Sequence, residues 1–149
     1  MKQVEESKNA KNVRVHTLLK VEQEGIKEEF LTIEEGQLFR KAGAIFIKYE
    51  EKITIDHQSH NTNVLVKLLE NGALEIVRSG ATRMKLRFVL GQEVPSSLQS
   101  GHGAMALSTK ASKIDHQVLG EDKGKVCLDY ELYSAGERLG TYEFVLSYE

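Results

Sequence analysis

Apolar and polar residues alternate along most of this chain, and the alternation is most regular near its C-terminus. Two runs there carry an apolar residue at every second position: Val126, Leu128, Tyr130 and Leu132, then Tyr142, Phe144, Leu146 and Tyr148. A period of two puts apolar side chains on one face of a β-strand and polar side chains on the other. The pattern therefore predicts antiparallel strands with one buried face and one solvated face.

The same alternation predicts about ten strands and no helix. Besides the two C-terminal strands, strands are expected at 13–22, 29–38, 45–49, 64–69, 73–79, 83–88, 104–109 and 113–119. Asn71-Gly72 is the strongest turn signal between them, because both residue types tolerate the positive φ of a tight hairpin. The longest expected loop is 91–103, which contains Pro95 and several serines and glycines.

These strands are expected to form one closed sheet. Consecutive strands with short connections favour an antiparallel meander. An open twisted sheet of about ten strands is difficult to stabilise, and closure into a barrel removes its exposed edges. We therefore predict an all-β protein, an antiparallel up-and-down β-barrel of about 8–10 strands, with a two-sheet sandwich as the alternative. The barrel domain would span 13–149 and follow a flexible N-terminal segment at 1–12.

Composition narrows the compartment and the partners. The 149 residues carry a net charge of −2, which gives no overall attraction to nucleic acid or to anionic membranes. The single cysteine, Cys127, cannot form an internal disulfide and fits a reducing compartment. The first residues lack the apolar core of a signal peptide, and no apolar run is long enough to span a membrane. We therefore expect a cytoplasmic protein with no membrane partner, and the net charge disfavours nucleic acid as a partner.

Several short motifs resemble those of the YwiB-like family of small, functionally uncharacterised bacterial proteins. The motifs are Tyr49-Glu50-Glu51, Ile76-Val77-Arg78-Ser79-Gly80, Met84, and Tyr130-x-Leu132…Gly136…Gly140…Leu146-x-Tyr148. Their order and spacing agree together over most of the chain after residue 12. The resemblance implies a calycin-type, lipocalin-like barrel, and it implies no known activity or catalytic residue. This chain departs from the family at His102, where relatives carry an aromatic residue, and it has no tryptophan for the signature of true lipocalins.

Arg78 is the polar residue that most clearly interrupts the inward apolar face. It shares the parity of Leu74 and Ile76, and Tyr49 and Glu51 have inward parity on their own strand. An inward guanidinium needs either a protein carboxylate or a ligand anion. Two interpretations follow: a salt bridge between Arg78 and Glu51 that closes one end of the barrel, or a ligand site. Some calycin-class barrels hold a fatty-acid carboxylate with interior arginine and tyrosine, which is consistent with the second interpretation.

The histidines give weaker signals. His116 has the inward parity of Ile114 and Val118, which suits either a hydrogen-bonded core residue or a ligand contact. His57 and His60 have a spacing that could hold a metal, but zinc sites use three or four ligands and no further His or Cys lies close in sequence. No nucleophile motif or phosphate-binding loop is present. We therefore expect no metal, no cofactor and no catalytic residues.

Two outward-facing sets of residues point to macromolecular partners. The first is a basic row that would suit an acidic protein or nucleic acid, formed by Arg83, Lys85 and Arg87. It lacks the interleaved aromatic residues that bind single-stranded nucleic acid. The alternative interpretation is a solvated outer face whose charge discourages pairing with another strand edge. The second set is apolar and could form a homodimer face; its members are Phe46, Leu65 and Leu69.

The sequence thus predicts a small cytoplasmic β-barrel that binds a small apolar or anionic ligand. The ligand would lie in the barrel or at its mouth, against Arg78, Tyr49, Glu51 and His116. The alternative is an interaction module that uses the outer basic face and has no catalytic activity. Enzymatic activity ranks last, because no base and nucleophile are paired in the sequence.

Overall fold

The described part of the chain folds entirely into β-strands. The structure is a computed structural model that describes residues 10–55 and 57–149. Across these ranges it contains ten strands and no helix: β1 (Lys11–Gln23), β2 (Ile26–Lys41), β3 (Ala44–Ile55), β4 (Gln58–Leu68), β5 (Leu74–Ser79), β6 (Arg83–Phe88), β7 (Glu93–Ser100), β8 (Gly103–Gly120), β9 (Lys123–Ser134) and β10 (Glu137–Tyr148). The predicted flexible segment 1–12 falls mostly outside these ranges, and its residues Lys11 and Asn12 belong to β1.

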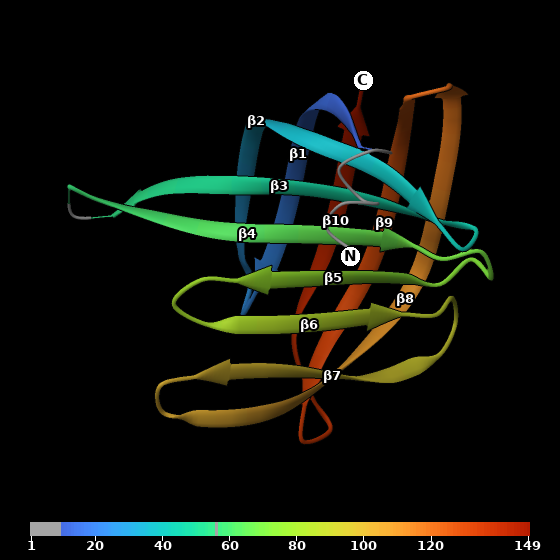
Figure 1. The fold of residues 1–149 in the computed structure, drawn as a ribbon. Helices are drawn as coiled ribbons and strands as arrows, with labels where there is room; N and C mark the ends of the chain where they lie inside the picture. Colours follow the sequence, from blue (N-terminus) through green and yellow to red (C-terminus); the bar gives the residue numbers. More distant parts are fainter. Residues whose placement is uncertain (1–9, 56) are drawn as a thin grey trace.

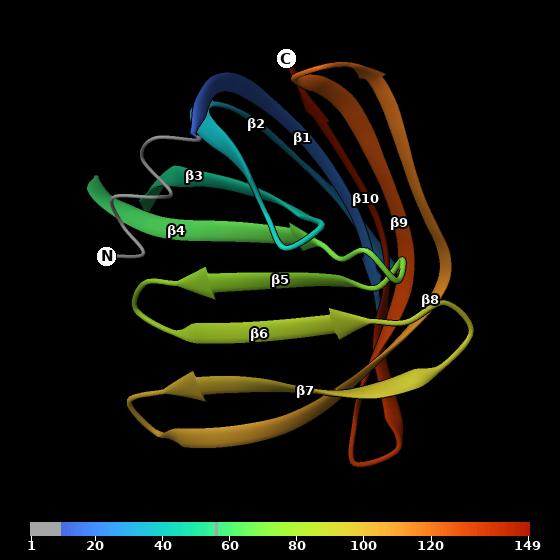
Figure 2. The same cartoon turned by 45° about the vertical axis from the view of Figure 1, so that its right-hand side comes forward.

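The strands form a closed antiparallel barrel. Each strand pairs with the next in sequence, and β10 pairs with β1 to complete the ring. This confirms the predicted up-and-down barrel and excludes the two-sheet sandwich. Strands β3 to β7 run across β1, β9 and β10, and the bent strands β2 and β8 pass from one layer to the other (Figures 1 and 2).

The barrel has two ends that differ in their residues. The chain enters β1 and leaves β10 at one end, together with the turns at 42–43, 69–73, 89–92 and 121–122. We call this the Tyr148 end, after the last residue of β10. The opposite end carries the turns at 24–25, 80–82, 101–102 and 135–136. We call it the Arg78 end, because Arg78 lies just before the turn that follows β5.

Inward side chains fill the barrel with one apolar core. The largest fully buried ones include Tyr148, Phe88, Leu38, Ile47, Leu74, Leu128 and Leu146. Burial of a side chain of this size stabilises the fold by roughly 1.5–3 kcal/mol relative to leaving it exposed. Every second residue from Val126 to Leu132 and from Phe144 to Tyr148 is buried, as the alternation predicts.

Strand β8 differs from the two strands expected at 104–109 and 113–119. It is one continuous strand of 18 residues. Its pairing with β9 shifts register between Ala111 and Lys113, which marks a β-bulge. A bulge inserts an extra residue and bends the strand while pairing continues on either side. The expected break in the strand is therefore a bend.

The prediction of a loop at 91–103 is also wrong, because most of this segment forms β7. Pairing with β8 runs from Glu93 to Ser100. The Arg87 backbone N–H donates a hydrogen bond to Ser96 Oγ at 3.1 Å, which adds a contact to β6. Serine and glycine have weak strand propensity, but propensity depends on context and is overridden here by strands on both sides.

Strands β2 and β3 pair only along a short seam. Backbone pairing joins 36–41 of β2 to 44–49 of β3. Among the described residues, the remaining part of β2 at 26–35 pairs only with β1. Figure 2 shows β2 leaving β3 to follow β1. One edge of this part of β2 is therefore not covered by any other strand of the described chain.

Candidate functional site

Arg78 and Glu51 meet inside the barrel. Backbone pairing places Arg78 beside Val64, and Val64 beside Tyr49, so that Arg78 and Tyr49 share one inward row. Glu51 is the next inward residue along β3, and its Oε1 lies 2.6 Å from Arg78 Nη2. The same Nη2 donates a hydrogen bond to Glu51 Oε2 at 3.3 Å. The structure therefore contains the salt bridge that one of the two sequence interpretations expects.

The two members of this ion pair differ in burial. Glu51 is only 7% exposed, whereas 35% of the Arg78 side chain is exposed. Oε1 of Glu51 accepts no hydrogen bond from the described residues, although it lies close to Arg78 Nη2. Removing a carboxylate from water costs several kcal/mol, and a neighbouring cation offsets much of that cost. Arg78 thus makes the buried charge of Glu51 tolerable.

Two tyrosines from different strands feel the charge of the ion pair, and a third stacks on one of them. Burial raises the pKa of Tyr49, the charge of Glu51 raises it further, and Arg78 opposes the shift. Burial also raises the pKa of Tyr130, with Tyr142 adding to the shift and Arg78 opposing it. Tyr130 stacks on Tyr142, with ring centroids 4.8 Å apart and nearly parallel planes. The guanidinium therefore acts electrostatically on tyrosines from both β3 and β9.

Sequence reasoning assigned Tyr130 and Tyr142 to the apolar core and not to the site. Their inward parity is correct, but alternation treats a tyrosine as an apolar residue. The available signal was the phenolic hydroxyl itself, which needs a polar environment inside a barrel. The alternation does not show that β9 faces β5 across the interior, so the closeness of Tyr130 to Arg78 could not be predicted from it.

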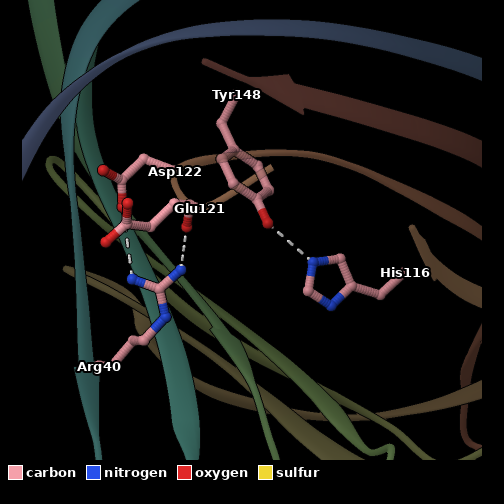
Figure 3. A network of polar contacts seen from close by, with 5 residues as sticks. All are labelled: Arg40, His116, Glu121, Asp122 and Tyr148. Carbon is pink, nitrogen blue, oxygen red and sulfur yellow. Dashed lines mark hydrogen bonds and ion pairs between the residues drawn. The ribbon is translucent and has the colours of Figure 1, made fainter. Parts of the chain in front are cut away.

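His116 does not join this group. It lies toward the Tyr148 end, where its Nε2 is 2.9 Å from the hydroxyl oxygen of Tyr148 (Figure 3). Burial lowers the pKa of His116, and the charge of Asp115 opposes that shift. His116 is half-buried, and Val118 in the same row is exposed, so His116 is a hydrogen-bonded residue at the edge of the core and not a fully buried one.

Arg40 ties the same end of the barrel across its rim. It comes from the end of β2, and its Nη1 lies 3.4 Å from Asp122 Oδ1 in the turn between β8 and β9. Its Nη2 donates a hydrogen bond to the carbonyl oxygen of Glu121 (Figure 3). The contact links the corner between β2 and β3 to the β8–β9 turn. Sequence reasoning missed it, because neither residue interrupts an alternating pattern.

Gly124 leaves the space that the Tyr148 ring occupies. A Cβ atom at Gly124 would lie 2.5 Å from Tyr148 Cζ and 2.8 Å from the carbonyl oxygen of Gln117. Contacts that short require the ring or the backbone to move. The absence of a side chain at Gly124 is therefore what allows Tyr148 to reach His116.

A groove of about 620 Å³ lies at the Arg78 end, against β1, β2, β9 and β10. Most of its lining residues are charged and have outward parity: Lys20, Lys27, Arg138, Glu22, Glu29, Asp129, Glu131 and Glu143. The Tyr133 hydroxyl donates to Glu131 Oε2 at 2.9 Å, and this hydrogen bond is the main reason why the pKa of Glu131 is lowered. None of the four predicted ligand residues lines the groove, but Tyr130 and Tyr142 do.

The basic row of β6 is partly neutralised within the chain. Arg83, Lys85 and Arg87 are exposed, as predicted. However, Oε1 of the buried Glu75 lies 3.6 Å from Lys85 Nζ and 3.3 Å from Lys67 Nζ. Binding of an acidic partner would therefore depend mainly on Arg83 and Arg87, the two exposed arginines of the row.

The apolar set predicted as a homodimer face is less exposed than expected. Phe46, Leu65 and Leu69 are all half-buried. Phe46 stacks on the buried Phe39 with ring centroids 4.9 Å apart. Part of this apolar surface is thus already buried by packing within the chain. Its role in a dimer stays a prediction.

Comparison with known proteins places this barrel in a family. Residues 13–146 match the family described as "Domain of unknown function (DUF1934)". The chain belongs to this family. It is also 27% identical, over 139 residues and 92% of each chain, to the uncharacterized β-barrel protein YwiB of Bacillus subtilis (strain 168). These findings confirm the resemblance to the YwiB-like family.

The fold of this DUF1934 member agrees with that of its relative. The crystal structure of YwiB from Bacillus subtilis matches it with a TM-score of 0.78 at 23% identity, over 94% of this chain and 92% of that one. The family description and the relative's name state no ligand, substrate or partner. In the described chain, no helix is long and apolar enough to cross a membrane. The calycin-type label and the cytoplasmic location stay predictions.

Proposed function

We propose that the barrel binds a small amphipathic or anionic molecule at its Arg78 end, with the polar part of that molecule against Arg78 and Glu51. One observation carries the proposal: the inward Arg78 keeps unused hydrogen-bonding capacity and is partly open to solvent. A guanidinium has several N–H donors, and only Nη2 of Arg78 contacts Glu51.

The surroundings of the pair support a ligand with a polar group and an apolar part. About a third of the Arg78 side chain is open to solvent, which gives a ligand access from the end of the barrel. Tyr142, which is half-buried and stacks on the buried Tyr130, offers aromatic surface on which an apolar or aromatic body could pack. In such a complex Arg78 would bind an anionic group by charge-assisted hydrogen bonds, and Glu51 would hold the guanidinium in place.

Energetics also favour recognition over a purely structural role for the pair. Replacing a buried ion pair by apolar residues of similar volume is often neutral or stabilising. A barrel with an apolar core would therefore lose little by carrying two aliphatic residues at 51 and 78. The ion pair is therefore better explained by contact with a ligand than by a gain in stability. His116 lies at the opposite end of the barrel and has no part in this site.

Mass spectrometry of the purified full chain tests the proposal directly. We expect a native mass above the sequence mass and release of a small molecule on denaturation. The double variant Arg78→Leu/Glu51→Leu removes both charges and leaves neither one unpaired, so it should fold and lose that molecule. Arg83→Gln is the matched control, because it removes an exposed outward arginine and should retain the molecule.

Added probes give a second readout. Sodium decanoate, an anionic amphiphile, should raise the melting temperature of the wild type, because a ligand that binds only the folded state stabilises it by mass action. Decanol, which lacks the charge, should raise it less. The double variant should respond equally to both. A wild-type protein without a co-purifying molecule and without a decanoate response would reject the proposal.

A further inference from the structure

The outward face of the β1–β2 hairpin exposes large apolar side chains on a folded barrel. Leu31 is 77% exposed and Ile33 is 66% exposed, both on β2. Leu18 and His16, their neighbours on β1, are half-buried. Single exposed apolar residues need no explanation, but adjacent ones on one sheet face mark an interaction surface.

Charged residues frame this apolar surface in an ordered way. Cross-strand pairing gives four outward rows, which we call the hairpin face: Lys20–Glu29, Leu18–Leu31, His16–Ile33 and Arg14–Glu35. The two middle rows are mostly apolar. Each outer row has a base on β1 and an acid on β2, and Arg14 Nε lies 3.4 Å from Glu35 Oε1 within the chain.

We propose that the hairpin face docks on the same face of a second copy of this chain, around a two-fold axis that runs parallel to the strands between β1 and β2. This axis sets β1 of one copy opposite β2 of the other at the same level. Lys20 of one copy then faces Glu29 of the other, and Leu18 faces Leu31. Arg14 faces Glu35 in the same way. Every contact is repeated by symmetry, as in an isologous interface.

The arrangement of charges selects this axis over the alternative. An in-plane axis perpendicular to the strands would set Lys20 against Arg14, and Glu29 against Glu35. Like charges opposite one another disfavour such a complex. With the parallel axis, opposite charges meet at both ends of the apolar centre. Sheets that pack face to face in an aligned manner keep their strands within about 30° of each other, which this axis allows.

Other features of the hairpin favour a face contact with a second copy. Among the described residues, only β1 pairs with β2 at 26–35, so another sheet can approach the hairpin without meeting β3. Pairing through that open edge is disfavoured by its charges, because edge glutamates discourage strand addition. The segment 22–35 holds six glutamates and one lysine, which also disfavours an anionic lipid surface.

Sedimentation velocity of the full chain, from about 1 to 500 µM, measures the association. We expect a concentration-dependent dimer for the wild type. Leu31→Glu should raise the dissociation constant by about tenfold or more, because it places a charge at the centre of the interface. Val118→Glu is the matched control, since Val118 is 63% exposed on β8 outside the hairpin face. This control should dimerise as the wild type does.

A charge reversal tests the axis itself. Lys20→Glu should weaken the dimer, because it sets a second carboxylate against Glu29 of the other copy, and the double variant Lys20→Glu/Glu29→Lys should restore it. Under the perpendicular axis, Lys20→Glu would face Arg14 and strengthen the dimer, which would overturn the proposed geometry. Arg83→Glu makes the same charge change on β6 and should have no effect. A wild type that stays monomeric at every concentration, or a dimer that Leu31→Glu does not weaken, would overturn the interface.

Discussion

The two ends of this barrel treat their polar residues in opposite ways. At the Tyr148 end, Tyr148 bonds to His116, and Arg40 links the β2–β3 corner to the β8–β9 turn. At the Arg78 end, the partly exposed Arg78 pairs with the buried Glu51, and Gln23 donates a hydrogen bond to Tyr142. The contacts of the Tyr148 end thus join a strand corner to a turn across the rim, whereas the Arg78 end carries a charge pair whose arginine is open to solvent. The proposed ligand site depends on this inward, partly exposed charge pair.

The largest effect is expected at the Arg78 end itself. Arg78→Met should lower the free energy of unfolding by about 3 kcal/mol, because it leaves the buried charge of Glu51 unpaired. Because Arg78 is partly exposed, we expect this loss of stability to lie at the lower end of the range of about 3–5 kcal/mol that is typical for breaking a buried ion pair. Adding Glu51→Gln should restore most of the stability, since the charge is then gone. Urea denaturation measures both values, and a double variant no more stable than Arg78→Met would contradict the role given to the ion pair.

A somewhat smaller loss is expected where the Tyr148 end is most tightly packed. Gly124→Ala should lower the free energy of unfolding by about 2 kcal/mol, because the new Cβ overlaps the Tyr148 ring and a backbone oxygen. Gly101→Ala is the matched control, because no atom lies within 4 Å of its Cβ position. Equal stability of the two variants in urea denaturation would show that the Tyr148 ring moves at little cost.

Removing one hydroxyl at each end compares the two ends directly. Tyr148→Phe should cost about 1 kcal/mol, because it removes the hydrogen-bond partner of His116. Tyr142→Phe at the Arg78 end removes a more exposed hydrogen bond, in which Gln23 Nε2 donates to Tyr142 Oη at 2.7 Å, and should cost less. Thermal unfolding of both variants checks the order. A larger loss for Tyr142→Phe would reverse the assignment of the Tyr148 end as the tied one.

The smallest effect concerns pH and again belongs to the Tyr148 end. Burial lowers the pKa of His116 in the folded state, so the unfolded chain binds a proton first as pH falls below about 6.5. Stability should therefore decline as pH falls from about 7.5 to 5.5, with the full contribution of His116 present only at the higher pH. His116→Asn should flatten the decline. Identical pH profiles of the two proteins would show that His116 does not carry it.

The alternation predicts much of the fold because side-chain direction in a strand depends only on parity. It correctly turns Arg78, Tyr49 and Glu51 inward, and it shows that Arg78 and Glu51 could meet. Parity says which face a residue occupies and does not say which residue lies opposite it. The contacts between His116 and Tyr148 and between Arg40 and Asp122 depend on strand register and bending, so they could not be predicted. For the same reason the bulge in β8 appeared as a break between two strands.

Sequence reasoning selected apolar residues that are less exposed in the structure than others it did not select. It selected Phe46, Leu65 and Leu69, which neighbouring strands half bury. The more exposed residues, Leu31 and Ile33, lie where β2 separates from β3. That separation depends on how the barrel bends, which is a property of the whole sheet. The irregular placement of Phe30 and Ile33 in the sequence was the one local sign of it.

The pairing of β1 with β10 has a consequence for how the protein folds during synthesis. Backbone hydrogen bonds in both directions join Arg14 to Glu149, so the first and last strands are neighbours. The ring cannot close until β10 has left the ribosome, and until then β1 presents an open edge. Contacts between such distant parts of a chain slow folding, because a long loop must be ordered first. A circular permutant opened at the 135–136 turn would make the β1–β10 pair local and would leave β9 and β10 as the distant strands that close the ring, so the late step would move to that pair without being removed.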